Sequence, residues 1–109
     1  DGPGRTTRMI ARTWRGAVRA DDAAVYASYI QQTGIDAYKA TPGNLGAWLL
    51  WRPDGERAEI ITLSFWESRE AIEGFAGPDI ETAVFYPEDD RFLVERDLTA
   101  HHYEVAGPE

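Results

Sequence analysis

Hydrophobic residues follow two different spacings along the chain, and the two spacings alternate from segment to segment. Residues 57–66 contain no glycine or proline and are rich in β-branched and aromatic side chains, which predicts a strand. Strand-like runs at 9–15, 45–52 and 98–105 predict three more strands. Both alternating sets of side chains in 60–66 are largely apolar, so we expect the sheet to be covered on both faces.

Helical spacing separates these strands in two places. Asp21 or Asp22 is a suitable N-cap for a helix over 23–33, which we expect to continue as another turn at 35–39 after an interruption at Gly34. The apolar stripe of this helix consists of Val25, Tyr26, Tyr29 and Ile30.

The second helical segment directly follows the strand at 57–66. Ser68 can cap it, since a serine oxygen accepts hydrogen bonds from free amides of a first turn. Its apolar positions are Ala71, Ile72 and Phe75. Gly77-Pro78 is expected to end this helix and to start a short one that reaches Val84, before a polar loop at 87–90.

Pro53-Asp54-Gly55 predicts a hairpin between two antiparallel strands. The order β-α-β-β-α-β is that of a ferredoxin-like α+β fold, in which both helices pack on one face of a four-stranded antiparallel sheet. Apolar side chains are nevertheless expected on both faces: Trp48, Leu50, Ile61, Leu63 and Phe65 on one, and Leu49, Trp51 and Ile60 on the other. Soluble monomers avoid so large an exposed patch, so we predict a homodimer whose sheets pack face to face and close a shared barrel.

Composition narrows the class of protein further. A chain of 109 residues that is 43% hydrophobic predicts one folded domain, which we place at 9–106, with 1–8 as a flexible extension or cloning remnant and 107–109 as a tail. The net charge of -8 opposes binding to nucleic acid and to anionic membranes. No segment is a candidate membrane span, and the lack of cysteine is compatible with the cytoplasmic location that we predict.

Three segments resemble the antibiotic-biosynthesis-monooxygenase (ABM) superfamily of dimeric α+β barrels. They are SFWES at 64–68, AIEGFAGPDIETAVFYPEDDRFL at 71–93 and HHYEV at 101–105, and the similarity extends over nearly all of 9–105. The resemblance implies an apolar pocket between sheet and helices and a monooxygenase that uses no cofactor or metal. Its substrate would be an aromatic or polyketide-type phenol.

The superfamily also includes heme-degrading enzymes and members of unknown activity. The heme-degrading branch uses an asparagine on the first strand and a histidine on the later helix. Residues 9–15 contain no asparagine and residues 70–86 contain no histidine, so we do not expect heme degradation.

His101-His102 is the one pair of imidazoles in the sequence. Neighbours on a strand point to opposite faces, so the two cannot hold one metal together. HYEV at 102–105 is the part of this strand that recurs in the resemblance, so we predict that His102 faces the cavity as a base that deprotonates a phenol, leaving a phenolate able to reduce O2. The sequence alone leaves open which of the two faces the cavity, and also whether His102 is simply a hydrogen-bonded interior residue.

The remaining candidates follow from the resemblance and from side-chain chemistry. Trp66 matches the tryptophan that ends the third strand and lines the cavity in several superfamily members, and Tyr86 could hydrogen-bond a phenolic oxygen. The predicted substrate-binding residues are Arg12, Trp14, Phe75 and Arg91. The alternatives are core packing for the aromatic rings and a pair between Arg12 and Glu104 across the sheet.

Other chemistries lack a signal. Glu88-Asp89-Asp90 lacks the spacing and glycine of a calcium loop and predicts a solvated turn, and there is no phosphate-binding glycine motif or zinc motif. Two other functions remain open: a polyketide cyclase or isomerase that uses the same pocket without oxygen, and a domain that binds a small hydrophobic or aromatic molecule without changing it.

Overall fold

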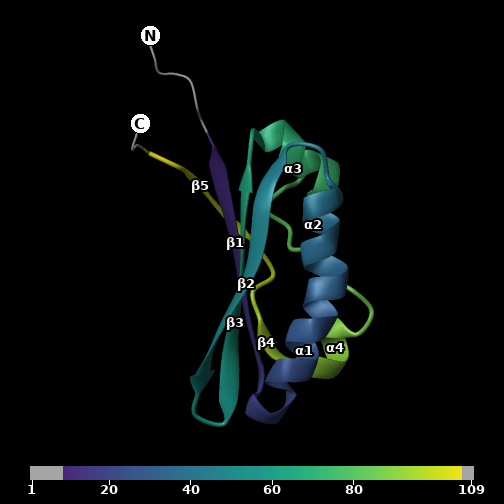
Figure 1. Cartoon of the computed structure of the whole chain (residues 1–109), viewed down its shortest axis with the longest axis vertical. Helices are drawn as coiled ribbons and strands as arrows, with labels where there is room; N and C mark the ends of the chain where they lie inside the picture. The colour runs from purple at the N-terminus through teal and green to yellow at the C-terminus, as the bar shows by residue number, and fades with distance from the viewer. Residues whose placement is uncertain (1–8, 107–109) are drawn as a thin grey trace.

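The computed structural model, which describes residues 9–106, is an antiparallel sheet with helices on one face (Figure 1). The strands are β1 (Ile10–Arg19), β2 (Asn44–Asp54), β3 (Arg57–Trp66), β4 (Leu93–Arg96) and β5 (His101–Glu104). The helices are α1 (Ala23–Ile30), α2 (Asp36–Ala40), α3 (Arg69–Ala76) and α4 (Asp89–Phe92), and a 3-10 turn at Ala20–Asp22 precedes α1. The α+β ferredoxin-like prediction is confirmed.

The sheet order is β2-β3-β1, and β4 and β5 share the remaining edge of β1. The strand predicted at 98–105 is present only in its second half, as β5; β4 was not predicted, and the described sheet has five strands. Asp97 N still donates to Arg15 O of β1 at 3.0 Å, whereas residues 98–100 leave β1 and pair with the chain after α3 instead. Ala83 N donates to Leu98 O at 3.0 Å and Ala100 N donates to Glu81 O at 2.8 Å. A tertiary contact therefore divides the segment 98–105, which the sequence pattern predicts to be one continuous strand.

The central hairpin agrees with its local sequence signals. β3 has the predicted bounds, and it pairs antiparallel with β2 through a turn at Gly55, whose φ of 66° favours glycine. β1 is longer than the predicted 9–15, because Gly16 to Val18 are buried and pair on both sides, with β3 and with β4.

The first helical segment is continuous from α1 to α2. The predicted interruption at Gly34 is instead a π turn (η3, Gln31–Ile35), which widens the helix without breaking it. Asp22 lies at the N-cap position but its side chain makes no capping hydrogen bond. Val25 does not belong to the buried stripe, since its side chain is 57% exposed.

The second helical segment begins as predicted and then departs from the prediction. Ser68 caps α3, with its Oγ accepting from Ala71 N at 3.1 Å, and Gly77 ends the helix with a φ of 87°. The short helix predicted up to Val84 is wrong: the chain between α3 and α4 is irregular and crosses the helix-bearing face. We call residues 77–88 the covering segment.

The two faces of the sheet differ in what covers them. Ile60 and Trp66 are fully buried under the helices, whereas Leu63 on the opposite face is only half-buried. In the described part of the chain no helix covers that opposite face (Figure 1), where Trp48 is 51% and Leu50 46% exposed. The apolar character of both faces is confirmed. No helix within residues 9–106 is long and apolar enough to cross a membrane.

Candidate functional site

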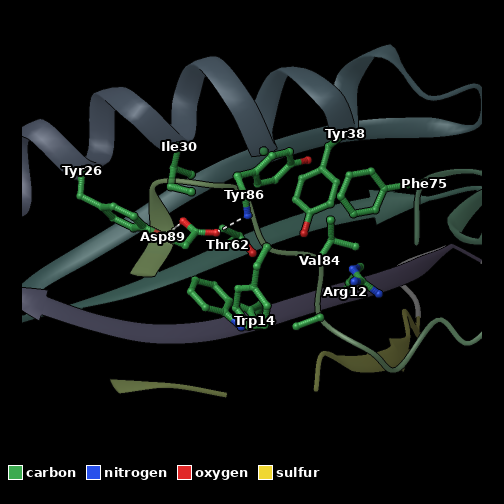
Figure 2. A pocket seen from close by; sticks show the side chains of 13 residues that line it. Arg12, Trp14, Tyr26, Ile30, Tyr38, Thr62, Phe75, Val84, Tyr86 and Asp89 are labelled. Atoms are coloured by element: carbon green, nitrogen blue, oxygen red, sulfur yellow. Dashed lines mark hydrogen bonds between the residues drawn. The ribbon is translucent and has the colours of Figure 1, made fainter. Parts of the chain in front are cut away.

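A cavity lies between the long helical segment and the sheet, and the covering segment forms one of its walls (Figure 2). Its walls are mainly aromatic: Trp14, Tyr26, Tyr38, Phe75, Phe85 and Tyr86. Its polar side chains include Arg12 from β1, Thr62 from β3 and Asp89 at the start of α4. The space that the centre of a water molecule can occupy in the cavity is about 30 Å³, so the cavity has room for about two water molecules.

Arg12 is the most unusual group in this cavity, because its side chain is charged and only 1% exposed. Its Nη1 donates to the backbone oxygen of Ile80 at 2.5 Å and to His102 Nε2 at 2.9 Å. Its Nε has no hydrogen-bond partner among the described residues. Burying a cation with incomplete hydrogen bonding is costly, and an anionic oxygen placed in the cavity would offset that cost.

His102 lies beside Arg12, its direct partner across the β1–β5 pair. A guanidinium can only donate, so His102 Nε2 is the unprotonated nitrogen and accepts the hydrogen bond. Burial, followed by the charges of Arg12 and Arg69, lowers the pKa of His102 to about 4. His102 is therefore neutral at neutral pH, and its basic lone pair is already engaged.

The other end of the cavity holds Asp89, whose side chain is 3% exposed. Its Oδ1 accepts from the Tyr26 hydroxyl at 2.9 Å and its Oδ2 from the Tyr86 backbone N–H at 2.6 Å (Figure 2, dashed line). Burial and the nearby Asp89 charge raise the pKa of Tyr26 well above its ordinary value. Burial, with a smaller contribution from Tyr38, raises the pKa of Tyr86. Both hydroxyls thus stay protonated.

Four predicted site residues line the cavity: Arg12, Trp14, Phe75 and Tyr86. Trp66 lies just behind the wall, where it is fully buried, donates from Nε1 to Ser64 Oγ at 2.8 Å and meets the Tyr38 ring edge-on at 5.8 Å. His102 lies behind Arg12 and is not part of the lining. Arg91 is outside, with a 72% exposed side chain paired to Glu88 at 2.9 Å.

Sequence reasoning missed several cavity residues. Four of them are spaced four residues apart on one side of the long helical segment: Tyr26, Ile30, Gly34 and Tyr38. This spacing is visible in the sequence only if the helix is assumed to continue through Gly34. Asp89 was predicted to lie in a solvated turn, which is wrong, because the neighbouring tyrosine hydroxyl and backbone amide allow the carboxylate to be buried. Runs of charged residues do not reveal such a contact.

No protein-family model and no curated protein sequence matches this chain. Among solved structures, it is similar to a candidate antibiotic biosynthesis monooxygenase from Bacillus cereus (18% identity, TM-score 0.63, covering 94% of this chain and 97% of that one). A protein of unknown function from Nitrosomonas europaea gives 12% identity and a TM-score of 0.68, covering 94% of each chain.

A third similar structure is the heme degrader MhuD from Mycobacterium tuberculosis, solved with two hemes bound in its active site. It is 23% identical, with a TM-score of 0.58, and the match covers 93% of this chain and 98% of that one. At these identities the likeness establishes the fold. The chain thus has the α+β fold found in structures of antibiotic biosynthesis monooxygenase type, over nearly its whole length.

Proposed function

We propose that this protein belongs to the ABM superfamily and binds an aromatic or polyketide-type phenol as its phenolate, with Arg12 on the anionic oxygen. The observation that carries the proposal is the buried guanidinium of Arg12, which lines an aromatic cavity while its Nε lacks a hydrogen-bond partner among the described residues. Both of its hydrogen-bond partners are uncharged, so a phenolate would be the stronger acceptor.

The proposed reaction is a cofactor-independent monooxygenation. An electron-rich phenolate gives electrons to O2, one oxygen atom becomes a carbonyl on the ring carbon opposite the phenolate carbon, and the other leaves as water with the hydrogen of that carbon and the phenolic proton. An anthrone that becomes an anthraquinone illustrates this balance, and no other reductant is required. Arg12 would stabilise the phenolate, because a fixed cation in a low-dielectric cavity favours negative charge. The Tyr38 hydroxyl points toward the strand that carries Arg12 (Figure 2) and would orient the oxygen atoms.

His102 can act as the base only after its lone pair is released. A phenol that accepts the Arg12 hydrogen bond would free His102 Nε2, which could then take the phenolic proton. Arg12 would favour this transfer by lowering the pKa of the bound phenol. Entry of a ringed substrate also requires the covering segment to move, because the cavity has room for about two water molecules.

A second candidate function is binding without catalysis. It is favoured by the narrow cavity and by the hydrogen bond that already occupies His102 Nε2. The heme chemistry of the Mycobacterium tuberculosis protein is not carried over, since neither histidine lines the cavity. We further propose a homodimer through the bare sheet face, where Trp48 and Leu50 are about half exposed. A cytoplasmic location remains a prediction.

Aerobic and anaerobic incubation of the protein with a panel of anthrones and quinols tests the proposed reaction. We expect consumption of the substrate only in air, with one O2 used per carbonyl formed. Equal consumption under nitrogen would favour a cyclase or isomerase. A substrate that binds tightly and is recovered unaltered in air would favour the binding domain, and both outcomes would contradict the monooxygenase.

A further inference from the structure

A second pocket lies directly behind the cavity. It is an outer pocket of about 260 Å³, open to solvent, lined by Arg69, Glu81, Thr99, Ala100, His101 and His102. His102 belongs to this outer lining, and Arg12 belongs to the lining of the inner cavity. The hydrogen bond of 2.9 Å between these two side chains joins one lining to the other. The pair is therefore a partition between the two spaces.

The same elements border both spaces. Helix α3 contributes Arg69 to the outer pocket and Phe75 to the inner cavity, six residues and about 9 Å further along its axis. The covering segment contributes Glu81 to the outer pocket and Ala83 to the inner cavity. The strand pair β1–β5, helix α3 and the covering segment thus border the inner cavity and the outer pocket alike.

We propose that the binding site extends through this partition and that Arg69 recognises a second anionic group on the ligand. The inference rests on the proposed function and specifies its ligand: a fused-ring phenolate that carries a carboxylate or similar oxyanion on the far side of its rings. The phenolate oxygen binds Arg12, and the rings lie against Phe75. The second anion lies in the outer pocket between Arg69 and His102.

The chemistry of the outer pocket suits such a group. His102 is neutral, and once a ligand separates it from Arg12 either ring nitrogen can carry the proton and donate to an anion. Arg69, from the first turn of α3, adds a cation. Glu81 is the one carboxylate in this lining, and it would disfavour ligands whose second anion lies toward the covering segment.

Two probes separate this inference from the proposed function: 2-naphthol, which has the phenolic oxygen alone, and 6-hydroxy-2-naphthoate, which adds a carboxylate across the rings. Dissociation constants for both are measured by tryptophan fluorescence with wild type, Arg69→Gln, Arg69→Lys and Arg19→Gln. Arg19 is exposed at the far end of β1 and is the matched control for loss of one positive charge.

We expect wild type to bind the carboxylate probe about fivefold more tightly than 2-naphthol. Arg69→Gln should abolish this preference without changing the affinity for 2-naphthol, Arg69→Lys should keep part of it, and Arg19→Gln should keep all of it. A preference that survives in Arg69→Gln, or none in wild type, would overturn the extended site and leave the proposed function intact. If neither probe binds wild type, both proposals fail.

Discussion

The two charged ends of the cavity are buried to a similar degree but differ in how well they are hydrogen-bonded. Asp89 is 3% exposed, and each of its oxygens accepts a hydrogen bond from an element that it holds in place, α1 or the covering segment. Arg12 is 1% exposed, yet its Nε has no partner within residues 9–106 and its Nη1 donates only to neutral groups. The comparison assigns Asp89 to the stability of the fold and Arg12 to ligand binding.

The largest effect on stability is expected at Asp89. Asp89→Ala removes the acceptor of two donors, the buried Tyr26 hydroxyl and the partly buried Tyr86 amide, and should lower the free energy of unfolding by about 3 kcal/mol. The matched control is Asp90→Ala, since that side chain is 88% exposed and makes a surface ion pair with Arg96. Its cost should stay below about 1 kcal/mol. Urea denaturation measures both, and equal costs would show that Asp89 is not a structural anchor.

A smaller effect concerns acid stability through His102. Its pKa falls from 6.5 to about 4 on folding, so between these pH values the unfolded chain binds more protons and the free energy of unfolding decreases as pH falls. Because His102 is partly exposed, we expect this effect to contribute about 2 kcal/mol to the free energy of unfolding. The contribution is present in full above pH 6.5 and is lost as the pH falls toward 4. Urea denaturation at pH 7 and pH 4.5 should show a larger loss for wild type than for His102→Gln. Equal losses of unfolding free energy in the two proteins would mean that burial and the Arg12 charge do not lower the pKa of His102.

The smallest effect, of opposite sign to that of Asp89, is expected from Arg12→Met. Methionine keeps much of the side-chain volume and removes a buried cation that has no charged hydrogen-bond partner, so the free energy of unfolding should stay constant or rise by about 1 kcal/mol. Thermal and urea denaturation of this variant provide the measurement. A decrease in the free energy of unfolding above about 2 kcal/mol would show that Arg12, like Asp89, stabilises the fold. The two ends of the cavity would then not differ in role.

The elements that the sequence predicted correctly depend on local signals. The hairpin before β3 rests on Gly55, and the start of α3 rests on the oxygen of Ser68. The errors come from long-range contacts. Leu98 and Ala100 read as strand residues, but their backbone groups pair with the covering segment. No pattern within one segment carries that information.

The candidate site shows the same division. Arg12, Trp14, Phe75 and Tyr86 were placed in the cavity from residue type, element and resemblance. The orientation of Trp66 depends on Ser64 and Tyr38, and that of His102 depends on Arg12, so their positions behind the wall required the three-dimensional arrangement. The assignment of Asp89 to the interior required knowing that α1 brings a tyrosine hydroxyl to it.

Binding of 2-naphthol to wild type and to Arg12→Met tests most directly whether the under-bonded cation is the ligand-binding group. The two proteins are compared by tryptophan fluorescence at a pH where both are folded, with Arg19→Gln as a control that keeps Arg12. A charge-assisted hydrogen bond in a closed cavity predicts that Arg12→Met weakens binding by about 10- to 100-fold while the control binds like wild type. A folded Arg12→Met variant with the dissociation constant of wild type would show that Arg12 is not the ligand-binding group.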